Sequence, residues 1–67
     1  MSTIGERIKT VRKAADMSQQ EFSQAICVSQ PFLSMVENGK ERPSKITIRL
    51  ISILFQIDES WLITGSS

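Results

Sequence analysis

Residues 17–39 have the sequence MSQQEFSQAICVSQPFLSMVENG. It contains two helix starts, at Ser18 and Ser29, because a serine hydroxyl can accept a hydrogen bond from a backbone N–H of the following turn. The apolar spacing after each serine predicts helices over about 19–26 and 30–38. A three-residue link between two short helices is typical of a helix-turn-helix.

Boundary signals support both of these helices. Glu21 lies three residues after Ser18, so the two residues can form a capping box. Pro31 falls in the first turn of the second helix, where a proline leaves no intrahelical bond unmade. Asn38 and Gly39 then supply the stop for that helix.

A helix over about 4–15 is predicted before the pair. Thr3 can cap it, and Glu6 completes a second capping box. The apolar positions at helical spacing are Ile4, Ile8, Val11 and Ala15. The charged positions expected on the remaining surface are Arg7, Lys9, Lys13 and Asp16.

Two helices are predicted after the pair. Ser44 caps a helix over about 45–55, and Asp58 caps a short last helix through Trp61 to Ile63. Strand signals are weak, because no run of residues alternates between apolar and polar over several positions. The sequence therefore predicts an all-α domain of five short helices.

The chain has 67 residues, which is the size of one small domain. We place that domain at residues 1–65 and interpret 66–67 as a tail or the start of a linker. The absence of histidine and the single cysteine, Cys27, exclude an intrachain disulfide, a Cys/His zinc site and a Ser-His-Asp catalytic arrangement. We expect no catalytic residue, metal, cofactor or small-molecule site, and we do not predict an enzyme.

The sequence contains no signal for a membrane or secreted protein. The longest near-apolar stretch, residues 50–55, is far shorter than the roughly 20 residues that span a membrane. The N-terminus lacks a charged region followed by an apolar run, so it does not resemble a signal peptide. We expect a cytoplasmic protein with no membrane partner.

The outward side of the helix over 30–38 carries no charge. At about 100° per residue, Leu33 and Val36 define the inward side of this helix. The residues opposite them are Gln30, Pro31, Ser34, Met35 and Asn38. A neutral face of this kind suits close approach to base edges and thymine methyl groups in the DNA major groove, where the second helix of a helix-turn-helix binds.

The net charge of +1 hides an uneven distribution. Residues 1–17 carry +2 and residues 39–50 carry +3, whereas 18–38 and 51–67 each carry −2. The two basic segments can contact phosphates on either side of a groove, which would supply affinity and register. Alternatively, three of the lysines contact only solvent and have no role in binding, namely Lys9, Lys13 and Lys45.

Several short motifs together resemble the phage repressor/Cro type of helix-turn-helix domain, also called the Xre type. These motifs are MSQQEF at 17–22, VSQ at 28–30, VENGK at 36–40 and DESWLITG at 58–65. The resemblance covers about residues 4–65. It implies a compact five-helix, lambda-repressor-like fold, and a regulator of transcription whose partner is double-stranded DNA.

The resemblance also implies roles for individual residues. The positions that face bases are Gln30, Pro31, Ser34 and Met35. The positions that contact the DNA backbone are Gln19, Ser29, Asn38, Lys40 and Arg42. Gln19 would also brace the glutamine of the recognition helix, Gln30. Arg12 and Glu37 match an ion pair between the first and third helices, which would keep Glu37 from repelling phosphate.

The sequence departs from the family pattern at two positions. Family members usually have glycine in the turn between the two helices, where this chain has Cys27. A positive φ at this residue would cost on the order of 1 kcal/mol. Similarly, Gln56 stands where a glycine commonly ends the fourth helix.

The helix over 45–55 has more apolar residues than packing on one side requires. The face expected on the core consists of Thr47, Ile48, Ile51, Leu54 and Phe55. The adjoining face consists of Ile46, Leu50 and Ile53. It predicts the contact of a two-fold homodimer, to which Ile57 and Ile63, beyond this helix, also contribute. In the alternative, the last helix folds over this face and buries it within one chain.

Two functions fit these observations. The first is a sequence-specific transcriptional regulator, a repressor, that binds a palindromic operator as a dimer through the major groove. The second is a protein-interaction module, such as an antitoxin-like partner, with DNA binding secondary. The second would use the apolar face of the fourth helix to bind its partner.

Overall fold

The computed structural model describes residues 3–66, and these residues form helices and no strand. The helices are α1 (Ile4–Ala14), α2 (Gln19–Ala25), α3 (Gln30–Glu37), α4 (Lys45–Phe55) and α5 (Glu59–Thr64). This confirms the predicted all-α architecture, with each boundary within about one residue of its predicted position. The predicted domain start at 1–2 and the second residue of the predicted tail, Ser67, lie outside the described residues.

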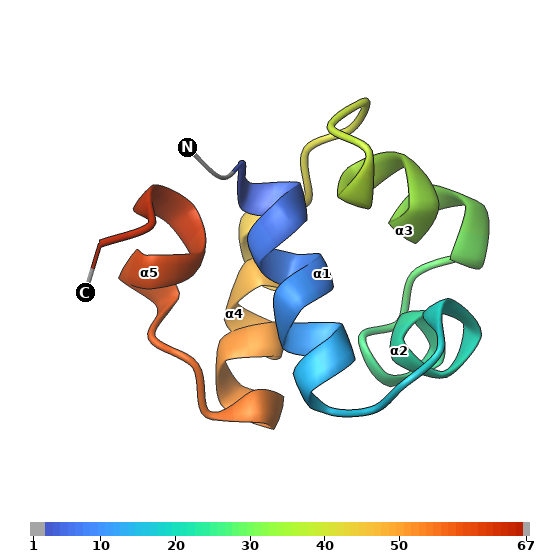
Figure 1. The fold of residues 1–67 in the computed structure, drawn as a ribbon, viewed down its shortest axis with the longest axis horizontal. Coiled ribbons are helices and arrows are strands. Elements are labelled where there is room, and N and C mark those ends of the chain that lie inside the picture. Colours follow the sequence, from blue (N-terminus) through green and yellow to red (C-terminus); the bar gives the residue numbers. More distant parts are fainter. Residues whose placement is uncertain (1–2, 67) are drawn as a thin grey trace.

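The helix α1 lies in the middle of the molecule. It packs against α3 on one side and α5 on the other, while α2 packs against α3 and α4 against α5. Figure 1 accordingly shows α5 at one end of the longest axis and α2 with α3 at the other. The buried core between them consists of Ile8, Val11, Phe22, Ile26, Leu33, Val36, Ile48, Ile51 and Leu62.

Every helix begins at the cap that the sequence predicts. The side chains of Thr3, Ser18, Ser29, Ser44 and Asp58 each accept a hydrogen bond from a backbone N–H of the first turn. The first two belong to complete capping boxes, because the glutamate three residues on accepts a hydrogen bond from the backbone N–H of the cap.

The backbone is left-handed at the two positions where this chain lacks the glycine that is usual in the family. Cys27 has φ 63° and Gln56 has φ 55°, so both turns keep the geometry of the family without a glycine. Asp16, which directly follows the C-cap of α1, also has a positive φ, of 58°, and this was not predicted. A short polar side chain makes this conformation less costly for aspartate than for most residues.

The prediction that Arg7 lies on the surface is wrong. Its side chain is buried, and its Nε and Nη2 donate hydrogen bonds of 2.9 Å to the carbonyl oxygens of Leu62 and Ile63. The carbonyls in the last turn of a helix have no partner within that helix. Arg7 provides donors for these carbonyls and ties the end of α5 to α1.

The division of α4 into a core face and an exposed face is only partly correct. Ile48 and Ile51 are buried as expected, but Leu54 is 48% exposed. Conversely, Leu50 from the predicted contact face is half-buried and packs against the core. α4 packs against α5, and its buried stripe is narrower than the predicted one and shifted from Leu54 toward Leu50.

Candidate nucleic-acid interface

The outward face of α3 is exposed and uncharged, as the helical spacing predicted. Its inward side is formed by Leu33 and Val36, which are 1% and 2% exposed. On the outward side, Gln30, Pro31 and Asn38 are exposed, Ser34 is half-buried and Met35 is 39% exposed. The charged residue of α3, Glu37, is buried and points away from this face into a network of hydrogen bonds.

That network joins three helices. Arg12 on α1 donates from Nε to Glu37 Oε2 at 2.7 Å and from Nη2 to Glu37 Oε1 at 3.1 Å. Its remaining Nη1 donates to the carbonyl oxygen of Met17, in the loop before α2, at 2.9 Å. The expected pair of Arg12 and Glu37 is therefore present and bidentate, which holds α3 in one orientation on α1.

Gln19, at the start of α2, also belongs to this network. Its Nε2 donates to Glu37 Oε1 at 3.0 Å, so the partner of its amide is the buried acid. The expected support of Gln30 by Gln19 is not the contact that the structure contains. The physical reason is that Glu37 is an ionised acceptor with two oxygens, which attracts an amide donor more strongly than a neutral side chain does.

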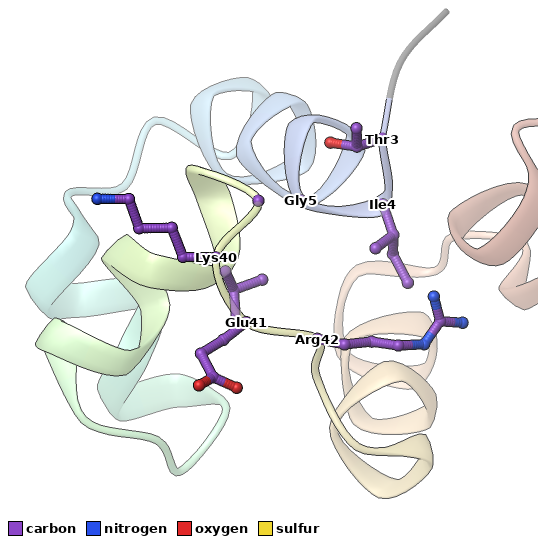
Figure 2. Close-up of a pocket in the computed structure, with 8 residues that line it drawn as sticks. Thr3, Ile4, Gly5, Lys40, Glu41 and Arg42 are labelled. Atoms are coloured by element: carbon purple, nitrogen blue, oxygen red, sulfur yellow. The ribbon is translucent and has the colours of Figure 1, made fainter.

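Two cations lie in the loop after α3. Lys40 and Arg42 are exposed, and the loop they occupy lines a hollow of about 370 Å³ against the start of α1. Figure 2 shows their side chains pointing in opposite directions from this loop. Ser29 and Asn38 cap the two ends of α3, and Lys40 follows Asn38 by two residues.

Gly5 determines how closely α1 approaches α3. A Cβ atom built on this residue would lie 1.9 Å from the carbonyl oxygen of Val36, so no other residue fits without movement of a backbone. Gly5 was not predicted from the sequence as a contact residue. A signal for it exists, because glycine near a helix start lowers helix propensity and is retained where two backbones approach closely.

Arg7 was missed as well, and its position contained a signal. It lies three residues after Ile4 and four before Val11, which places it on the apolar stripe of α1. A charged residue on such a stripe is expected to be buried with a partner.

Within residues 3–66, no group of three or more His, Cys, Asp or Glu side chains gathers where it could hold a metal ion. No helix among these described residues combines the length and the apolar character that crossing a membrane requires.

A family model described as helix-turn-helix matches residues 8–62, and therefore spans all of α2 and α3 and every residue of the buried core given above. This chain belongs to that helix-turn-helix family. The match confirms the family resemblance that the motifs suggested. The family is not a class of enzymes.

Three relatives share sequence with this helix-turn-helix chain. The ImmF control region 10 kDa protein of Bacillus phage phi105 is 38% identical over 82% of the chain and 61% of the relative. Antitoxin PezA of Streptococcus pneumoniae is 40% identical over 79% of the chain and 32% of the relative. The HTH-type transcriptional regulator DicA of Escherichia coli is 30% identical over 94% and 47%. The chain thus spans about a third to three fifths of the length of these relatives.

Two solved structures of the P22 c2 repressor share the fold. One, in complex with synthetic operator 9T, superimposes with a TM-score of 0.89 at 24% identity and covers 98% of this chain and 100% of that chain. The other, a solution structure of the DNA-binding domain, has a TM-score of 0.85 at 25% identity and covers 96% and 84%. The five helices of the described residues therefore have a phage repressor-like arrangement.

Proposed function

We propose that this domain is a sequence-specific DNA-binding regulator of transcription, a repressor, that places α3 in the major groove of double-stranded DNA in the cytoplasm. The observation that carries this proposal is the exposed, uncharged face of α3, whose orientation is held by the buried pair of Arg12 and Glu37. A neutral face can enter the groove without placing an acid next to a phosphate. Because the pair of Arg12 and Glu37 fixes α3 on α1, the side chains of this face would stay in register with the bases.

The proposed contacts divide into two groups. The residues that would face bases are Gln30, Pro31, Ser34 and Met35. The residues that would contact the DNA backbone are Gln19, Ser29, Asn38, Lys40 and Arg42. In support of the second group, Ser29 accepts the N–H of Phe32 with its oxygen and so keeps its hydroxyl hydrogen available for a phosphate. Gln19 uses Nε2 for Glu37, which leaves its oxygen and second hydrogen available.

The proposal includes a two-fold homodimer that binds a palindromic operator. The contact would be formed by Ile46, Leu50, Ile53, Ile57 and Ile63. In support, Ile46 and Ile53 are 80% and 66% exposed, and Ile63 is 38% exposed, so α5 leaves much of this apolar surface uncovered. Two copies related by a two-fold axis would present two α3 helices to two half-sites.

Selection from a random duplex library tests DNA binding. We expect enrichment of an inverted repeat, with an affinity that falls steeply as salt concentration rises. In the selected duplex, Gln30→Ala should relax base choice at one position per half-site and weaken binding by about 1–3 kcal/mol. Lys40→Ala is the matched control, because loss of a phosphate contact should weaken all sequences equally. If no sequence is enriched at low salt, the proposal is wrong.

A second candidate is an antitoxin-like module that binds a protein partner. Two observations favour it, namely the similarity to antitoxin PezA and the exposed apolar face of α4. In this function Ile53→Lys would abolish partner binding and Gln30→Ala would leave it unchanged. If the protein is instead a DNA-binding regulator, Gln30→Ala should change the duplex sequence that is selected.

A further inference from the structure

We infer that Arg49 and Glu59 form crossed ion pairs in the proposed dimer, in which Arg49 of each copy binds Glu59 of the other. The crossed pairs rest on the proposed dimer and make a second copy of this chain its preferred partner. Apolar contact is non-directional, so by itself it distinguishes poorly between this chain and a related one. Two opposite charges at fixed positions add a criterion that a partner must match.

Arg49 lies inside the surface proposed for the dimer. Its side chain lines an apolar hollow of about 250 Å³ on α4, together with Ile46, Leu50 and Ile53. This side chain is 70% exposed, so its charge meets water in a single chain. A second copy seated on the hollow would exclude that water. Removal of a cation from water is costly unless a carboxylate binds it.

Within one chain, Arg49 has a loose contact with Glu59, the first residue of α5. The Nε and Oε2 atoms are 3.5 Å apart, which is longer than the roughly 2.7–2.9 Å of a charge-assisted hydrogen bond. A guanidinium has several N–H donors, so it can bind a second carboxylate as well. Water screens the contact in the single chain, so below the concentration at which the chain dimerises the loss of either charge should change stability little.

Glu59 is the acid of this region that is available for such a contact. The charged residues between positions 45 and 66 are Lys45, Arg49, Asp58 and Glu59. The carboxylate of Asp58 already accepts the backbone N–H of Ser60 at 3.0 Å and caps α5. The carboxylate of Glu59 has the loose contact with Arg49 instead, and it can bind a stronger donor in the dimer.

The symmetry of a dimer brings these charges together. A two-fold axis makes every contact occur twice, so residue i of one copy meets residue j of the other and the reverse. Arg49 lines the hollow at the centre of the proposed contact, and Glu59 lies 3.5 Å from it, so both charges lie near the axis. Crossed pairs place opposite charges next to each other where excluded water no longer screens them.

Exchange of the two charges within one chain tests the crossed pairs. The variant Arg49→Glu/Glu59→Arg keeps the net charge of +1 and should dimerise with itself about as strongly as the unmodified chain does. When it is mixed with the unmodified chain, glutamate would face glutamate and arginine would face arginine. The heterodimer should therefore be at least about tenfold rarer than random association predicts. Ion pairs that stay within each chain predict free mixing instead.

Energy transfer between two fluorophores measures the mixing. Cys27 is the single cysteine of the chain and is exposed, so one protein can carry a donor and the other an acceptor at this position. The matched control is Lys9→Glu/Glu41→Arg, which exchanges two exposed charges outside α4 and α5 and should mix freely with the unmodified chain. Sedimentation equilibrium gives the dissociation constant of each homodimer.

A single reversal provides a second measurement. Arg49→Glu places a glutamate opposite Glu59 twice in the dimer, so the dissociation constant should rise at least about tenfold. Addition of Glu59→Gln to this variant removes the opposing acid, so part of the affinity should return. This comparison puts no cation at the start of α5, where it would oppose the helix dipole, and it decides the question if the exchanged variant does not fold. Circular dichroism checks the folding of every variant.

Three results would count against the crossed pairs. Free mixing of the exchanged variant with the unmodified chain would overturn them and leave the proposed dimer intact. The same conclusion would follow if Arg49→Glu dimerised normally, or if Glu59→Gln restored none of the lost affinity. If the unmodified chain stays monomeric at every concentration, the crossed pairs are rejected together with the proposed dimer.

Discussion

The buried carboxylate of Glu37 is the residue on which the orientation of α3 depends. It accepts hydrogen bonds from Arg12 and Gln19, and its side chain is 2% exposed. Two ions taken out of water lose hydration, so such a pair adds little net stability. Removal of one partner nevertheless leaves the other ion buried without compensation, which is strongly unfavourable.

We therefore predict that Glu37→Ala lowers the free energy of unfolding by about 3 kcal/mol or more. The matched control is Glu59→Ala, which removes an acid from the ion pair with Arg49, where the atoms are 3.5 Å apart and the side chains are 37% and 70% exposed. Because water screens this second pair, its loss should cost less than about 1 kcal/mol. Urea unfolding of both variants measures the difference, and equal small losses would contradict the role given to Glu37.

At the scale of the helices, the starts are stabilised by local hydrogen bonds. The backbone N–H of Ser18 donates to Glu21 Oε1 at 2.9 Å, and the corresponding bond from Thr3 to Glu6 has the same length. These bonds favour the ionised carboxylate, so they lower the pKa of Glu21 and of Glu6 below the ordinary glutamate value.

This shift predicts a pH dependence of stability. Because the pKa of Glu21 is lower in the folded than in the unfolded chain, its stabilisation is complete above the ordinary glutamate pKa of about 4.3 and is lost as pH falls through the folded value. The variant Glu21→Gln lacks this contribution, so its stability should fall less steeply with acid. Urea unfolding between about pH 7 and pH 3 measures the slope.

Glu41→Gln is the control for this experiment, because Glu41 lies in the loop after α3 and belongs to no capping box. Parallel acid profiles for Glu21→Gln and the unmodified chain would contradict the prediction.

At the scale of the whole molecule, α1 connects the proposed DNA-binding side to the opposite end. Gly5 lies against the last turn of α3, and two residues later Arg7 binds the last turn of α5. The exposed part of α4 remains outside these contacts, and it forms a hollow lined by Ile46, Arg49, Leu50 and Ile53. We propose this surface as the centre of the dimer.

Ile53→Lys tests the dimer without disturbing the core, because Ile53 is 66% exposed, whereas the half-buried Leu50 also packs against the core. A lysine at position 53 of both copies would place like charges at the contact, so sedimentation equilibrium should show a shift toward monomer. Gln24→Lys adds the same charge on the exposed side of α2 and should leave the mass unchanged. An identical mass distribution for both variants and the unmodified chain would refute this interface.

The helix starts were predictable because they depend on neighbours in the chain, as with Ser18 and Glu21, which are three residues apart. The left-handed turns at Cys27 and Gln56 were expected because family members usually have glycine there, whereas the one at Asp16 was not predicted. The outward face of α3 was predictable because helical geometry alone relates Leu33 to Met35. The ion pair between Arg12 and Glu37 was expected from the family resemblance.

The starts of the five helices of the described residues and the uncharged face of α3 followed from the amino-acid sequence, because caps and helical periodicity act over a few residues. Which side chains bridge two helices depended instead on how the helices pack. Arg7 meets the end of α5 across 55 residues, Gly5 meets Val36, and Gln19 turns to Glu37 instead of Gln30. Such contacts depend on how helices pack, because carbonyls and carboxylates that are satisfied by water in an isolated helix must find other partners when packing excludes water.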